Sequence, residues 1–84
     1  MKLNSLYEIC WNDAKSEHIT TLDEFLKKGF AKKVSIGWVV YQDKDKVVLC
    51  SEKDAEEKFK PDMSGDYTLV PFDWITKTRK LDGN

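Results

Sequence analysis

The strongest pattern in the sequence is a pair of apolar runs joined by a short polar turn. Val34 to Tyr41 reads as an extended strand in which Val34, Ile36, Trp38 and Val40 share one face. Gln42-Asp43-Lys44-Asp45 is a turn, and Lys46 to Ser51 is a second apolar run. We therefore expect a β-hairpin at the centre of the fold, with Gly37 marking a bend or a close backbone approach.

Three more strands are predicted around this hairpin. Leu6 to Trp11 alternates, Tyr67 to Val70 is a short strand, and Ile75 to Leu81 is a last strand. In the last strand Ile75, Lys77, Arg79 and Leu81 are expected on one side. Pro71-Phe72-Asp73-Trp74 fits a tight turn or a turn of 3₁₀ helix.

One short helix is predicted after the first strand. Thr21-Leu22-Asp23-Glu24 is a capping box, and Gly29 is a stop signal after Lys27 and Lys28. Leu22, Phe25 and Leu26 form an apolar stripe. Because about two turns of helix are not stable alone, this stripe is expected to pack on the rest of the domain.

The fold expected from these elements is mostly β (α+β). Residues 1–84 form one domain, in which 52–66 is a charged mobile loop with a helical turn around Ala55 to Phe59. A flat sheet of short strands would leave its edges and one face uncovered. The prediction is therefore a five-stranded SH3-like small barrel with one short helix.

Charge and cysteine content exclude several classes of protein. The chain has fourteen basic and fifteen acidic residues, so its net charge is −1, which argues against a general polyanion binder. No apolar run is long enough for a signal peptide or a membrane helix, so a cytoplasmic protein with no membrane partner is expected. Cys10 and Cys50 are interpreted as reduced, buried thiols, with a disulfide as the alternative if their strands are neighbours.

A catalytic set is not apparent in the sequence. The single histidine, His18, has Ser16 and Glu17 as chain neighbours, which does not favour the geometry of a triad. No glycine-rich phosphate motif and no paired metal-ligand spacing are present. A non-enzymatic protein without cofactor or metal is predicted.

Candidate binding residues come from the aromatic and basic side chains. Trp11 precedes a polar loop, and with Asp13 and Ser16 it offers a stacking face, an acceptor and a hydroxyl. Lys77 and the sole arginine, Arg79, suit phosphate, although lysines on a sheet edge also block unwanted pairing. Trp38 completes the candidate ligand site, with a place in the core as its alternative role.

Several segments resemble a group of small uncharacterised phage and prophage proteins. Trp11-Asn12-Asp13-Ala14-Lys15-Ser16 resembles their W-x-D-A-x-S opening, and Val34 to Val40, Asp45 to Leu49 and Pro71 to Ile75 resemble their middle and end. The closing pattern is also similar to SH3-like barrels, which are mainly binding modules. The resemblance implies a phage-encoded barrel in the host cell cytoplasm and carries over no catalytic residue.

Two classes of binding function follow, with a third behind them. In the first, the protein sequesters a nucleotide-like host immune signal as a homo-oligomer. In the second, it is a protein-interaction module that inhibits or adapts a host protein. Nucleic-acid binding is the third hypothesis and predicts a steep loss of affinity with salt.

Overall fold

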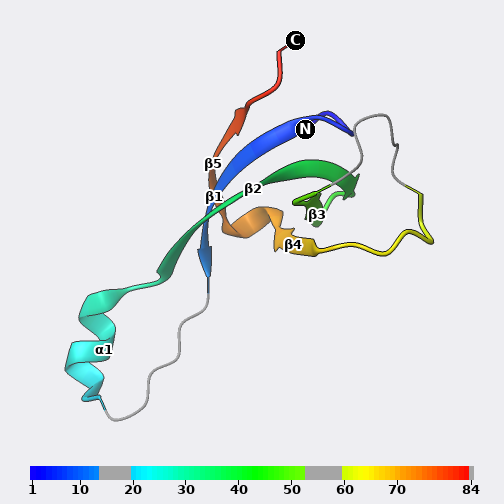
Figure 1. Cartoon of the computed structure of the whole chain (residues 1–84). Helices are drawn as coiled ribbons and strands as arrows, with labels where there is room; N and C mark the ends of the chain where they lie inside the picture. Colours follow the sequence, from blue (N-terminus) through cyan, green and yellow to red (C-terminus); the bar gives the residue numbers. More distant parts are fainter. Residues whose placement is uncertain (14–19, 53–59, 84) are drawn as a thin grey trace.

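The structure, a computed structural model, describes residues 1–13, 20–52 and 60–83. Within these ranges the chain forms one antiparallel sheet of five strands in the order β4-β3-β2-β1-β5 (Figure 1). The elements confirm the mostly-β class and the predicted order of strands, helix and 3₁₀ turn. In chain order they are β1 (Leu6–Asp13), α1 (Leu22–Lys28), β2 (Ala31–Gln42), β3 (Lys46–Cys50), β4 (Tyr67–Pro71), the 3₁₀ helix η1 (Phe72–Trp74) and β5 (Ile75–Lys80).

The sheet is open, and the predicted closed barrel is therefore not confirmed. β4 and β5 are the two edges of the sheet, and no ladder joins them in the described part of the chain. β4 pairs with β3 along its whole length of five residues, from Tyr67 to Pro71. The three-residue η1 follows β4 directly and leads into β5, which pairs with β1. Because the sheet does not close into a barrel, its core is covered by the curvature of the strands.

The core lies on one side of the sheet, which we call the inner face. Two bulges bend the strands toward it, one between Val39 and Tyr41 on β2 and one opposite Cys10 and Trp11 where β5 meets β1. Met1, Trp11, Phe72 and Ile75 pack against the core from its rim. The buried residues of the core cluster are Tyr7, Ile9, Val39, Val47, Leu49 and Val70.

The bulges change two of the predicted strand faces. On β2, Val39 is the buried residue, and Val40 occupies the bulge instead of continuing the row of Val34, Ile36 and Trp38. On β5, Ile75 pairs with Trp11 whereas Lys77 pairs with Cys10, and Thr76 is the extra residue.

The expectation that Ile75 and Lys77 share a side is therefore wrong. An inserted residue reverses the alternation of side chains, and a single-strand pattern does not reveal the insertion.

Gly37 sits where β2 approaches β3 closely. A Cβ atom at this position would lie 2.8 Å from the Cys50 carbonyl oxygen and 3.1 Å from the Leu49 Cβ. Real Cβ atoms do not approach backbone oxygen so closely, so the curl of β2 over β3 requires glycine here. The close approach predicted beside Trp38 is thus confirmed.

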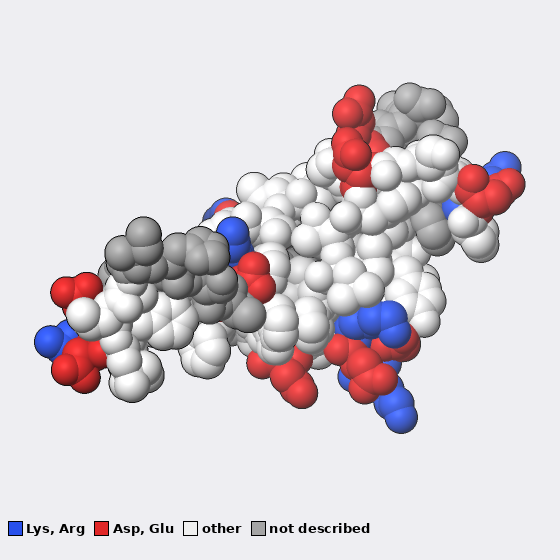
Figure 2. Space-filling model, turned by 90° about the horizontal axis from the view of Figure 1, so that it is seen from below, with Lys and Arg blue, Asp and Glu red and all other residues white. Residues whose placement is uncertain are grey.

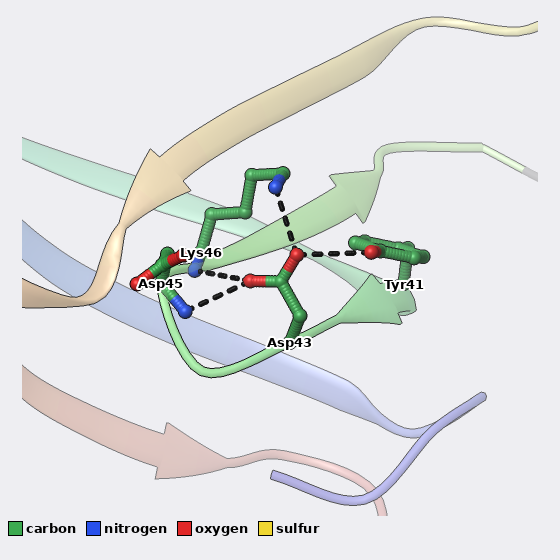
Figure 3. A network of polar contacts seen from close by, with 4 residues as sticks. All are labelled: Tyr41, Asp43, Asp45 and Lys46. Atoms are coloured by element: carbon green, nitrogen blue, oxygen red, sulfur yellow. Dashed lines mark hydrogen bonds and ion pairs between the residues drawn. The ribbon is translucent and has the colours of Figure 1, made fainter.

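Asp43 organises the turn between β2 and β3 (Figure 3). Its Oδ1 accepts hydrogen bonds from the backbone N–H groups of Asp45 and Lys46 at 2.8 and 3.0 Å. Its Oδ2 accepts from the Lys46 ammonium at 2.8 Å and from the Tyr41 hydroxyl at 2.9 Å. These bonds, with the Lys46 side-chain bond foremost, hold the pKa of the Asp43 carboxyl well below its usual range.

The helix α1 begins and ends as the sequence predicts. The Thr21 hydroxyl accepts a hydrogen bond from the Glu24 N–H at 3.2 Å, and Gly29 takes a φ of 68° at the C-terminal end. Among the described residues the expected packing on the sheet is largely missing: Phe25 is half-buried, but the side chains of Leu22, Leu26 and Phe30 are 71%, 67% and 70% exposed. Figure 1 shows α1 at the end of the molecule away from β3 and β4.

The molecule is correspondingly long and narrow. Its principal extents are 50 × 27 × 22 Å and its radius of gyration is 15.5 Å. A compact domain of 84 residues has a radius of gyration of about 12 Å. The projection of α1 away from β3 and β4 agrees with this long shape (Figure 1).

The predicted loop 52–66 is described only in part. The helical turn expected around Ala55 to Phe59 lies outside the described residues, and residues 60–66 contain no helix or strand. The Tyr67 hydroxyl donates to the Met63 carbonyl at 2.9 Å, which ties this segment to the start of β4. None of the described helices is long and apolar enough to cross a membrane.

Candidate functional site

The face opposite the core carries a continuous set of apolar side chains. Residues paired across an antiparallel ladder point to the same face of the sheet. One row of paired residues crosses four strands, from Leu6 on β1 through Trp38 and Cys50 to Tyr67 on β4. A second row joins Tyr41, Val48 and Leu69. We call this surface the outer face; its apolar members on β2, β3 and β4 are Val34, Ile36, Trp38, Tyr41, Val48, Tyr67 and Leu69.

Much of the outer face is open to solvent. Ile36 and Leu69 are each 53% exposed, and Val34 is 64% exposed. On the side of the molecule that Figure 2 shows, residues other than Lys, Arg, Asp and Glu, polar and apolar alike, cover a broad central area. Large contiguous apolar surfaces of this kind mark interaction sites, because a monomer gains nothing by exposing them.

Basic side chains outnumber acidic ones on the outer face. Glu8 on β1 pairs in register with Ile36 and with Arg79, and its carboxylate accepts a hydrogen bond from the Arg79 guanidinium at 3.2 Å. Asp43 neutralises Lys46 in the same way. The strand cations left over are Lys32 and Lys77, for which no ion pair occurs with another described residue.

One end of the outer face is fixed by the Asp43 turn. The Tyr41 ring lies beneath the Lys46 ammonium, 5.7 Å from the ring centre, and its hydroxyl is held by Asp43. The bond to Asp43 raises the pKa of the Tyr41 hydroxyl, so this group stays protonated as a donor. Tyr41 is thus presented in one orientation although it is exposed.

Trp11, the predicted stacking residue, lies on the inner face of β1. Its ring stacks on Trp74 with the ring centres 6.3 Å apart and the planes 17° apart. Its indole N–H donates to the Ser35 hydroxyl at 3.0 Å. One face of the Trp11 ring is therefore covered by Trp74, and its indole N–H is already bonded to Ser35.

The other predicted site residues do not gather around Trp11. Asp13 ends β1, half-buried opposite Ala31, and Ser16 lies outside the described residues. Trp38, Lys77 and Arg79 are on the outer face, which is the opposite side of the sheet from Trp11.

Strand β1 also lies between Lys32 on β2 and the pair of Lys77 and Arg79 on β5. The structure thus brings Lys77 and Arg79 together on the outer face of β5 and places Trp11 on the opposite face of the sheet.

Both cysteines are free thiols. Cys50 is buried and its Sγ donates to the Glu52 carbonyl, while Cys10 is half-buried on the outer face of β1. The alternative of a disulfide is not realised. Among the described residues no three His, Cys, Asp or Glu side chains come close enough to hold a metal ion.

The exposed residues Ile36, Tyr41 and Leu69 were not selected as functional from the sequence. A signal was present, because Val47-Val48-Leu49-Cys50 is apolar on both faces. In an antiparallel sheet a strand that is apolar on both faces indicates that both faces are to be covered. The core covers one of them, and the outer face is the other.

Comparison of the chain with protein-family models, with curated proteins and with solved structures gave no match in any of the three. The resemblance to small phage and prophage proteins therefore stays a prediction.

Proposed function

We propose that this protein is a protein-interaction module that binds a partner through the outer face. The observation that carries the proposal is the exposed apolar surface around Trp38, with Ile36 and Leu69 more than half exposed. Burying such side chains contributes about 25 cal/mol per Å² of apolar surface, and an aromatic anchor at the centre is typical of a binding hot spot.

The charges around this surface define the chemistry of the partner. Lys77 lies in register with Cys10 and Val34, and Lys32 lies beyond Val34 on β2, so both are at the end of the outer face away from Tyr41. Neither has an ion pair with another described residue. An apolar protein surface with acidic residues at its rim complements this arrangement. The preferred partner is therefore an acidic protein, not a nucleic acid, because only two strand cations are left over in the described part of the chain and the rest of the exposed outer face on β2, β3 and β4 is mainly apolar.

The fold supports the same class of protein. The strand order β4-β3-β2-β1-β5 and the 3₁₀ turn between the last two strands fit an SH3-like module. We propose that the domain is an open form of that barrel, phage-encoded as its sequence resemblance implies. Modules of this kind act by binding and need no catalytic residue.

The test is affinity capture from a lysate of the cells that naturally contain the protein, with mass-spectrometric identification of what binds. Ile36→Asp and Leu69→Asp place charge on exposed outer-face positions, so the sheet still folds. Leu26→Asp on α1 is the matched control. The proposal predicts one stoichiometric acidic protein, lost with both outer-face variants and retained with the control. Capture that is equal for all four proteins, or the absence of any stoichiometric partner, contradicts it.

A nucleotide-like ligand is the second candidate, because Trp74 is 40% exposed and its ring is stacked on Trp11. A base stacked on the free face of Trp74 gains about 1–3 kcal/mol. Thermal-shift titration with cyclic nucleotides and ADP-ribose derivatives tests this function. A stabilisation that Trp74→Ala abolishes supports it, and no shift with any of these compounds contradicts it.

Nucleic-acid binding, the third hypothesis, has the weakest support from the distribution of charge. It predicts that binding of duplex DNA or RNA weakens steeply with added salt. Binding that is absent, or insensitive to salt, contradicts it.

A further inference from the structure

The arm formed by α1 and Phe30 carries an apolar surface of its own. Leu22, Leu26 and Phe30 are each at least two-thirds exposed. Phe25, Leu26, Gly29 and Phe30 also line a shallow apolar hollow on the arm. An isolated helix of seven residues is marginal in water, so α1 needs a partner to persist as a helix.

The charges of α1 make the arm complementary to a second copy of itself. Asp23 and Glu24 lie in the first turn, and Lys27 lies in the last turn. When two such helices run antiparallel about a two-fold axis, the acidic turn of each lies beside the basic turn of the other. The same arrangement lets Leu22 of one copy fill the hollow at Gly29 of the other, where no atom lies within 4 Å of an added Cβ.

The surface area of the chain agrees with an uncovered interface. The protein exposes 6483 Å², whereas a compact monomer of 9.8 kDa exposes roughly 5,200 Å². The excess of about 1,300 Å² belongs to the chain as a whole, and the exposed side chains of Leu22, Leu26 and Phe30 contribute to it. A dimer formed through the arms would cover these side chains.

We propose that the chain forms a two-fold symmetric homodimer in which the α1 arms of two copies pack antiparallel. Leu22, Leu26 and Phe30 form its apolar centre, and Asp23, Glu24 and Lys27 its charged border. The interface uses the arm and leaves the outer face free, so it does not depend on the proposed function. It also gives the predicted homo-oligomer a definite surface.

Sedimentation velocity across a concentration series tests the dimer. The wild type is expected to shift from monomer to dimer with concentration. Leu26→Asp is expected to raise the dimer dissociation constant by about thirtyfold or more, because it places charge at the apolar centre. Ile36→Asp, on the outer face, is expected to leave the constant unchanged. A wild type that stays monomeric at its highest soluble concentration overturns the proposal, as does a dimer insensitive to Leu26→Asp.

A charge exchange tests the antiparallel arrangement itself. Asp23→Lys and Lys27→Asp each place like charges together in a homodimer, and each is expected to weaken it by about tenfold. Mixing the two variants pairs opposite charges again, so the mixture is expected to associate more tightly than either variant alone. No gain on mixing overturns the arrangement. Circular dichroism of each variant verifies that the sheet remains folded.

Discussion

Trp11, which the sequence predicts as a ligand-stacking residue, connects three elements of the fold. Its stack with Trp74 joins β1 to η1, and its bond to Ser35 joins β1 to β2. The sequence singled out Trp11 as an aromatic residue next to a polar loop. It did not indicate Trp74 as the stacking partner, because the two residues are far apart along the chain.

Trp11→Ala is expected to lower the free energy of unfolding by about 2 kcal/mol, since a half-buried ring and its stack are lost. Ser35→Ala removes only the hydrogen bond and is expected to cost about 1 kcal/mol. Urea denaturation measures both. A Trp11→Ala protein as stable as the wild type contradicts this packing and restores Trp11 as a free stacking residue.

Asp43 gives the hairpin a defined dependence on pH. Its carboxyl pKa is lowered in the folded state, so the stability it contributes is present above the unfolded value of about 3.9 and is lost as the pH falls toward the folded value. Asp43→Asn keeps an oxygen that accepts from the N–H groups of Asp45 and Lys46, but it removes the charge.

The Asp43→Asn variant is expected to lose part of the fall in Tm that the wild type shows below about pH 4. Thermal melts between pH 2 and 7, with Asp45→Asn as the control, measure this. Equal acid sensitivity in the wild type and Asp43→Asn is the result that contradicts the assignment.

Local sequence patterns predicted the strands and the helix. The bulges and the open edge of the sheet depend instead on which strands pair, and those patterns do not show it. The Thr21 N-cap and the strand over Val34 to Tyr41 depend on near neighbours, and both are confirmed. The predicted alternation of faces holds only as far as Val39, because the bulge places Tyr41 on the same face as Trp38. The bulges at Val40 and Thr76 and the open edge at β4 depend on which strands pair and in what register. For the same reason the sequence did not reveal that Trp11 and Lys77 lie on opposite faces.

Gly37 fixes how closely β2 curls over β3. Gly37→Ala is expected to destabilise the protein by about 2 kcal/mol, because the new methyl group overlaps the Cys50 carbonyl. Gly83→Ala adds the same group where nothing lies within 4 Å and is expected to be neutral. Denaturation midpoints of the two variants provide the measurement, and equal stability contradicts the close approach.

The projecting helix is expected to unfold independently of the sheet. Thr21→Ala removes the N-cap hydrogen bond and costs α1 about 1 kcal/mol. In the dimer, hydrogen exchange at the Phe25 amide should be faster in Thr21→Ala than in the wild type, while the Tm of the sheet stays constant. A matching fall in the Tm of the sheet shows instead that α1 packs on the domain.

The whole molecule presents two apolar surfaces, for which we propose different partners. The outer face of the sheet is bordered by cations and suits an acidic protein, while the arm is complementary to its own copy. Although the net charge of the chain is −1, cations outnumber acidic side chains on the outer face. The division into two surfaces also explains the long shape, since the arm and the sheet lie toward different ends (Figure 1).

Native mass spectrometry of the captured complex tests the central claim, partner binding through the outer face, most directly. The wild type is expected as two copies of the chain with bound partner, and Leu26→Asp as one copy with its partner. Ile36→Asp is expected as two copies without partner. A complex in which Ile36→Asp retains the partner at the wild-type ratio would contradict the claim.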